Sequence, residues 1–151
     1  MRRAWRIVKQ NHADTAFDGN GARLYGGRWN SQGLRVIYTG SSWSLASLEI
    51  LVHLNPRVSF NYVAIPVDFD PEMVETIVPA SLPAEWRDEP PPPCTKTIGD
   101  SWVRQARSAV LEVPSVIIPS ELNFLINPAH PDFTKIVIGK PQPFSLDQRL
   151  L

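Results

Sequence analysis

The chain has 151 residues, 43% of them hydrophobic, enough for one globular domain with its own core and too few for two of ordinary size. Lys plus Arg and Asp plus Glu number 15 each, so the net charge is zero. The chain therefore has no overall excess of positive charge that would attract nucleic acid or an anionic membrane. The single cysteine, Cys94, excludes an intramolecular disulfide and a metal site built from several thiolates. The sequence has no apolar run long enough for a secretory signal or a membrane span, so we expect a cytoplasmic protein.

The first forty residues differ in character from the rest. They hold seven Lys and Arg against two acidic residues, a net charge of +5, and six of the eight glycines, whereas all fifteen prolines follow Asn55. Alternating hydrophobicity predicts strands at residues 5–8 and 36–39. Glycine allows a backbone to approach a ligand closely, so residues 18–40 indicate turns around a ligand more than packed core.

A helix is expected after the second strand. Ser41, Ser42 or Ser44 is a suitable N-cap, and the Asn55-Pro56 pair ends the helix because proline disfavours helical geometry at the residue before it. A strand at residues 60–68 follows, and Pro66 places it at a sheet edge or at a bulge.

The remaining elements indicate a mixed α+β class. Residues 98–108 predict a second helix, with one apolar stripe formed by Ile98, Trp102, Ala106 and Ala109. Short apolar runs at residues 111–118, 124–126 and 135–138 complete a β-rich second half.

Glu49 is the most informative residue of the first helix. Residues spaced by three and four positions share a helix face, which places Glu49 in a stripe with Leu45, Leu48 and Val52. A carboxylate in such a stripe needs a hydrogen-bonding partner or has a chemical role. Taken alone, the pattern favours a structural bond to a nearby arginine.

A second candidate is the turn Gly26-Gly27-Arg28-Trp29-Asn30. A flexible, glycine-rich turn that presents a guanidinium suits a pyrophosphate, because arginine binds phosphate oxygens bidentately. A tight turn with a surface arginine explains the same residues, since neither the dinucleotide fingerprint nor the phosphate-loop pattern is present. Tyr38, at the end of a predicted strand, suits stacking on a flat ring or a place in the core.

Two proline bends follow in the second half. Val113-Pro114-Ser115 and Asn127-Pro128 each fix the direction of a polar side chain that could bond a sugar hydroxyl or a carboxamide, although simple turns account for both. Ser115 lacks the glycine-flanked elbow of a serine hydrolase. The three histidines are scattered and indicate no metal site.

The order of these elements, together with Val36-Ile37-Tyr38-Thr39, Ser47-Leu48-Glu49 and His130-Pro131, resembles the RES domain family. The family takes its name from an arginine, a glutamate and a serine, which correspond to Arg28, Glu49 and Ser115. The resemblance spans nearly the whole chain, and residues 82–100 match no family element.

The resemblance implies an ADP-ribosyltransferase-like fold, with split, mainly antiparallel sheets and flanking helices around an NAD+ cleft. It implies a toxin of a toxin–antitoxin pair that breaks the nicotinamide–ribose bond of NAD+ without a metal. Glu49 would stabilise the ribosyl cation, kept ionised by Arg28 or ribose hydroxyls, and Arg28 would hold phosphate or ribose. Tyr38 would stack on nicotinamide, and Ser115 and Asn127 would bond polar groups of the ligand. The implied partner is an Xre-like helix-turn-helix antitoxin that occludes the site, and the resemblance also suggests a toxin homodimer within the complex.

Several alternatives stay open at this point. The acceptor of the ADP-ribose group is water, phosphate or a protein side chain. A catalytically silent interaction module, braced by a Glu49–Arg28 pair, is a hypothesis of a different class. A ribonuclease toxin is disfavoured by the neutral net charge and by the lack of paired histidines.

Overall fold

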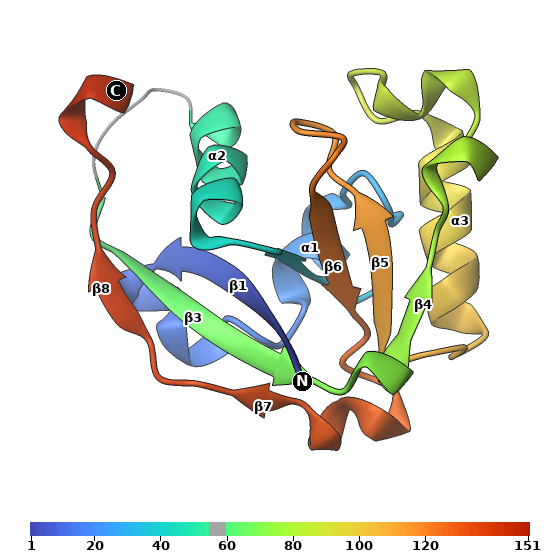
Figure 1. Ribbon diagram of the computed structural model, residues 1–151, viewed down its shortest axis with the longest axis horizontal. Coiled ribbons are helices and arrows are strands. Elements are labelled where there is room, and N and C mark those ends of the chain that lie inside the picture. Colours follow the sequence, from blue (N-terminus) through green and yellow to red (C-terminus); the bar gives the residue numbers. More distant parts are fainter. Residues whose placement is uncertain (55–59) are drawn as a thin grey trace.

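The fold is built on one twisted β-sheet (Figure 1). In the computed structural model, which describes residues 1–54 and 60–151, eight strands pair in the order β4-β5-β6-β2-β1-β3-β7, and β8 also pairs with β3. The strands are β1 (Arg2–Lys9), β2 (Ile37–Gly40), β3 (Tyr62–Phe69), β4 (Val74–Thr76), β5 (Val110–Pro114), β6 (Leu122–Ile126), β7 (Val137–Ile138) and β8 (Gln142–Phe144). The described pairs are antiparallel apart from β4 with β5.

The sheet is split in its middle. Strands β1 and β2 are joined through one residue pair, Trp5 opposite Gly40, whereas β1 and β3 pair along the whole of β1. Where the ladder would continue, the buried guanidinium of Arg6 donates to the backbone oxygen of Tyr38 at 2.9 Å and to that of Ala16 at 2.5 Å. The expected α+β class with split, mainly antiparallel strands is therefore confirmed.

Helices connect and cover these strands. The described helices are α1 (Asn20–Tyr25), α2 (Trp43–His53) and α3 (Pro93–Arg104), with 3-10 helices η1 (Gln10–Thr15), η2 (Pro71–Met73), η3 (Pro79–Ser81), η4 (Ala84–Arg87), η5 (Pro131–Lys135) and η6 (Gln148–Leu150). Figure 1 shows the turn between β5 and β6 lying between α2 and the segment that precedes α3.

Helices α2 and α3 cover the same face of the sheet, one on each half. Tyr38 and Gly40 point to one face because side chains alternate along a strand. Tyr38 packs in the cluster beneath α3, which includes Trp102, and an added Cβ on Gly40 would meet Ala46 of α2. The end of β2 thus brings the two helix-covered halves together.

The opposite face carries a second core. Its fully buried members come from five strands and include Ala4, Ile37, Val67, Phe69, Val110, Phe124 and Ile126. This core fixes the register of β2, β5 and β6, because a shift by one residue would turn these side chains outward.

The predicted second helix is displaced toward the N-terminus. Helix α3 begins with Pro93 in its first turn, where a missing N–H costs little, and ends at Arg104. Ala106 has a positive φ of 48° and Ala109 is buried next to β5, so the predicted stripe through these two alanines is wrong. Most of residues 82–100, which matched no family element, form η4 and the first part of α3.

Pro66 lies inside the sheet, contrary to the expected edge or bulge. Pro66 pairs with Trp5 of β1. On the side of β3 that faces away from β1, the strand pairs first with β8 and then with β7. Pro66 sits at the break between these two short strands, where its oxygen accepts a hydrogen bond from Gly139 N at 2.8 Å. A missing N–H is tolerated there because no strand needs it.

The boundaries of α2 lie close to those expected from the sequence, whereas the apolar run predicted at residues 111–118 is a strand only as far as Pro114. Ser42 caps α2 by accepting a hydrogen bond from Leu45 N at 3.0 Å, and α2 ends at His53. The predicted stop at Asn55-Pro56 falls outside the described residues. None of the helices in the described ranges is long and apolar enough to cross a membrane.

Candidate active site

Glu49 lies beside the face by which α2 packs on the β1 half of the sheet. The packing face consists of Ala46 with Trp43, Ile50 and Leu54, which cover the β1 half. Of the stripe predicted to surround Glu49, Leu45 is buried, whereas Val52 is 56% exposed. The predicted apolar stripe is therefore only partly buried, and Glu49 faces the ends of β5 and β6.

The Glu49 carboxylate is held by two side chains from the hairpin formed by β5 and β6. Asn123 Nδ2 donates to Glu49 Oε1 at 3.1 Å, and Ser115 Oγ donates to the same oxygen at 3.4 Å. Burial raises the pKa of Glu49 above its ordinary value, and the hydrogen bond from Asn123 is the largest effect that opposes this rise. A half-buried carboxylate with fixed donors can stabilise a positive charge that develops beside it.

Ser115 is placed by the bend that was predicted from Val113-Pro114-Ser115. It directly follows β5, is fully buried, and its Oγ accepts hydrogen bonds from Ile117 N at 3.1 Å and Ile118 N at 3.2 Å. These bonds fix the hydroxyl at the tip of the hairpin. The structure thus brings two of the expected residues, Glu49 and Ser115, into contact.

Asn123 was not predicted from the sequence. It lies on β6, and its Nδ2 also donates to the backbone oxygen of Thr39 at 3.1 Å, so the amide bridges β2 and Glu49. Its position two residues before Leu125 places it on the same sheet face as that buried leucine. A polar residue at such an inward position is the signal that could have found it.

We expect Asn123→Ala to raise the pKa of Glu49 further, because the substitution removes the main donor that favours the ionised form. The carboxyl titration of Glu49, followed by carbon NMR, measures this directly. Asn61→Ala, at an exposed asparagine, is the matched control. An unchanged titration of Glu49 in the Asn123 variant would show that the bond does not position the carboxylate.

The turn that carries Arg28 is rigid, contrary to the flexible turn that its glycines suggested. Asn30 is completely buried, and its Nδ2 donates to the backbone oxygens of Ala22, Ser31 and Leu34. Trp29 is 3% exposed and belongs to the core beneath α3. The turn therefore forms part of the packed core, and only its arginine side chain leaves it.

Tyr38 holds this turn from the sheet side. Its hydroxyl donates to Asn30 Oδ1 at 2.6 Å and accepts from Trp29 N at 3.0 Å, and burial raises its pKa. A Cβ at residue 27 would collide with the Tyr38 hydroxyl, which explains the glycine there. The observed role of Tyr38 is to position the turn, and its stacking on a flat ring stays a prediction.

Helix α3 holds the turn from the other side. Thr95 Oγ1 donates to Arg28 O at 2.7 Å, Lys96 Nζ donates to Gly27 O at 2.9 Å, and Asp100 accepts from Ser31 N at 2.8 Å and from its hydroxyl at 2.5 Å. These hydrogen bonds join the helix and the turn into one packed unit.

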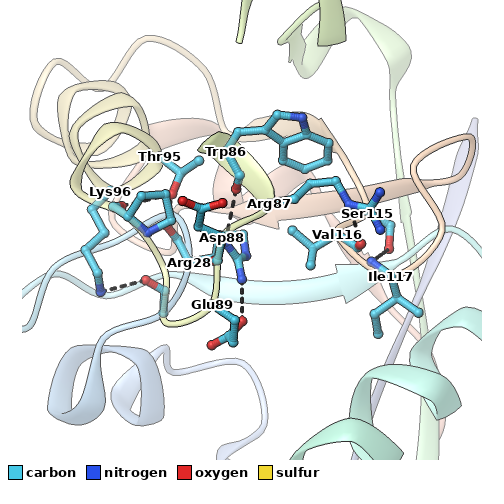
Figure 2. A network of polar contacts seen from close by, with 12 residues as sticks. Arg28, Trp86, Arg87, Asp88, Glu89, Thr95, Lys96, Ser115, Val116 and Ile117 are labelled. Atoms are coloured by element: carbon cyan, nitrogen blue, oxygen red, sulfur yellow. Dashed lines mark hydrogen bonds and ion pairs between the residues drawn. The ribbon is translucent and has the colours of Figure 1, made fainter. Parts of the chain in front are cut away.

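Arg28 does not bond Glu49, so the expected Glu49–Arg28 pair is wrong. Figure 2 shows the guanidinium directed to the segment before α3: it donates to Trp86 O at 3.0 Å, to Asp88 O at 2.8 Å and to Glu89 Oε2 at 2.6 Å. The positive charge of Arg28 still helps to lower the pKa of Glu49, but its effect is smaller than those of Asn123, His53 and Ser115.

Asn127 lies at the opposite end of the hairpin from Ser115 and Glu49. Its backbone N donates to Ala109 O at 2.9 Å, and its side-chain oxygen accepts from Ala129 N at 3.0 Å. These are the bonds of a turn that closes β6. Its assignment to the ligand stays a prediction, and the structure does not bring it to the other candidates.

Comparison with known proteins decides the family. Residues 3–147 match the family model described as the RES domain. The chain belongs to the RES domain family. A relative from Sphingobium sp. (strain YBL2), named "Prs ADP-ribosylating toxin", is 39% identical, and the match covers 97% of this chain and 95% of that protein. "Toxin Res" from Photorhabdus laumondii is 34% identical, and the match covers 97% of this chain and 96% of that protein. The expected RES domain toxin is thereby confirmed.

A solved structure supports the same fold. A chain from the crystal structure of the M. tuberculosis MbcT-MbcA toxin-antitoxin complex superimposes with a TM-score of 0.74 at 15% sequence identity, covering 95% of this chain and 84% of that chain. At this identity the likeness concerns the fold. It places the split sheet and its two covering helices among the folds used by toxin–antitoxin proteins.

Proposed function

We propose that this chain is the toxin of a toxin–antitoxin pair and acts by breaking the nicotinamide–ribose bond of NAD+. The observation that carries the proposal is the Glu49 carboxylate, which is half-buried and held by Asn123 and Ser115. The names of the relatives support the choice of substrate, because one of them is an ADP-ribosylating toxin.

Cleavage of the nicotinamide–ribose bond is favoured by a fixed negative charge beside the ribose. Loss of nicotinamide leaves an oxocarbenium-like cation, so a carboxylate there stabilises the transition state more than the ground state. Glu49 meets this need if it is ionised, and the donors Asn123 and Ser115 favour that form against the effect of burial. Nicotinamide departs as a neutral molecule from a cationic ring, so no strong general acid is required.

Arg28 supplies the complementary charge. A guanidinium binds two oxygens of a phosphate at once, and its turn is fixed by Tyr38, Asn30 and α3, so little ordering entropy remains to be lost on binding. We assign Arg28 to the pyrophosphate or ribose, and Ser115 to Glu49 and the ligand's polar groups.

The acceptor is tested by product identification. Purified protein incubated with NAD+ should release nicotinamide, and mass spectrometry with and without inorganic phosphate separates ADP-ribose from its phosphorylated form. NAD+ that survives a prolonged incubation with concentrated protein, with no protein modified, would refute the proposed activity.

Transfer of ADP-ribose to a protein is the second candidate. The name of the Sphingobium relative favours it, since ADP-ribosylation requires a target. Labelled NAD+ added together with a cell extract should then mark a discrete protein, and the label should be lost in the Glu49→Gln variant.

We further propose an antitoxin partner, which the resemblance gives as an Xre-like helix-turn-helix protein that occludes the site. The structural likeness to a chain of a toxin–antitoxin complex supports a partner of this kind. The lone Cys94 and the use of NAD+ fit action in the cytoplasm.

A further inference from the structure

The guanidinium of Arg28 already holds an anion from its own chain. Residues 84–92, which we name the strap, run from η4 to the start of α3 and provide all three of its acceptors, namely two backbone oxygens and the Glu89 carboxylate. The ion pair with Glu89 has an N–O distance of 2.6 Å. The strap therefore fills the place where the proposed function puts a phosphate.

The exposure of the two partners is unequal. The side chain of Arg28 is 11% exposed and that of Glu89 is 73% exposed. Arg28 is thus fixed in the protein, while Glu89 reaches it from solvent. Carboxylate and phosphate oxygens both accept from a guanidinium in a planar, paired geometry, so the two anions compete for the same donors.

The strap is attached to the rest of the protein at two further points. Arg87 Nε donates to Val116 O at 3.1 Å, next to Ser115, and the Trp86 ring packs against Trp29 with centroids 6.5 Å apart. Figure 2 shows the strap between Arg28 on one side and Val116, Ser115 and Ile117 on the other. Beyond Trp86, residues 87–90 are exposed, so this part can leave without disturbing the core.

We propose that Glu89 is a built-in competitor for the anion site at Arg28, and that the strap opens from Arg28 when the dinucleotide binds. The proposal rests on the proposed function, because it takes Arg28 as the ligand of the pyrophosphate. It also explains what the strap residues, which belong to the unmatched segment 82–100, do. They keep the guanidinium satisfied when no dinucleotide is bound, and they weaken the hold of small anions that make few other contacts.

The test measures NAD+ affinity in a Glu49→Gln background, where consumption of the ligand is expected to be at least about 100-fold slower. Glu89→Gln should lower the dissociation constant by about threefold to tenfold relative to the parent, because the competing charge is gone. Glu89→Lys should lower it at least as much. Glu85→Gln and Glu85→Lys, at an exposed glutamate of the same strap, control for the change in net charge. Titration calorimetry gives the constants.

The salt dependence supplies a second readout. Screening weakens an exposed ion pair, so the advantage of Glu89→Gln over the parent should shrink as salt rises. An affinity for NAD+ in the Glu89 variants that equals or falls below that of the Glu85 controls would overturn the strap proposal. NAD+ turnover by the wild-type protein, assayed in parallel, keeps the two ideas apart: turnover with unchanged affinity refutes the strap alone, and no turnover and no binding refutes the proposed function as well.

Discussion

Glu49→Gln should reduce NAD+ turnover by at least about 100-fold, the scale on which enzymes lose activity when a group that stabilises transition-state charge is neutralised. The substitution keeps the shape of the side chain, and its amide oxygen can still accept from Asn123 and Ser115. The loss of activity would therefore result from the missing negative charge. Chromatography of the released nicotinamide measures the rate of turnover.

The same variant should stay folded, which separates chemistry from structure. Because folding raises the pKa of Glu49, the stability that its protonated form provides is present below the ordinary pKa and is lost as pH rises through the folded-state value. At neutral pH the neutral glutamine should then be at least as stable as glutamate. Glu121→Gln, at an exposed glutamate, is the control. Wild-type turnover by a folded Glu49→Gln protein would remove Glu49 from the mechanism.

Local patterns in the sequence were enough to predict β1, β2 and the helix that carries Glu49. Alternation located β1 and β2, and a serine run followed by an apolar stretch located α2 with its cap at Ser42. These signals are local, since side-chain periodicity and an N-cap are set by neighbours within a few residues. Glu49 and Ser115 were identified on the same basis together with the family resemblance.

The partners of those residues could not be predicted in this way, because they are contributed by segments far apart in the chain. Glu49 and Asn123 are 74 residues apart, and Arg28 and Glu89 are 61 residues apart. A sequence pattern indicates that a buried carboxylate needs a donor, but only the fold selects which one. The predicted Glu49–Arg28 pair was wrong for this reason, because Glu49 bonds Asn123 and Arg28 bonds Glu89 instead.

The rigidity of the arginine turn also depends on distant contacts. Glycine at 26 and 27 suggested mobility, yet Lys96 and Tyr38 fix that turn from two sides. Helix α3, which provides part of this support, begins earlier than its apolar stripe predicts, because Pro93 belongs to the helix although it continues the proline run that precedes it. Proline is well suited to the first turn of a helix, so the same residue could equally have marked its beginning.

Gly99→Ala should destabilise the protein by about 3 kcal/mol or more, although the same change usually stabilises a helix by roughly 1 kcal/mol. Gly99 lies within α3 where the helix meets the arginine turn, and an added Cβ would overlap the backbone oxygen of Trp29 and lie 2.7 Å from its carbonyl carbon. Backbone atoms cannot rotate out of such an overlap as the end of a flexible side chain can. Helix α3 would have to shift away from the turn, and this shift would distort the hydrogen bonds from Thr95 and Lys96 to the turn.

Gly21→Ala supplies the opposite expectation in the same protein. Gly21 lies in α1, and a Cβ there meets nothing within 4 Å, so alanine should leave the melting temperature unchanged or raise it. Urea unfolding of both variants measures the difference in the free energy of unfolding. Because α3 positions Arg28 through this contact, a Gly99→Ala protein that still folds should also bind NAD+ more weakly. A Gly99 variant as stable as wild type would mean that α3 and the turn do not form the single unit on which the placement of Arg28 depends.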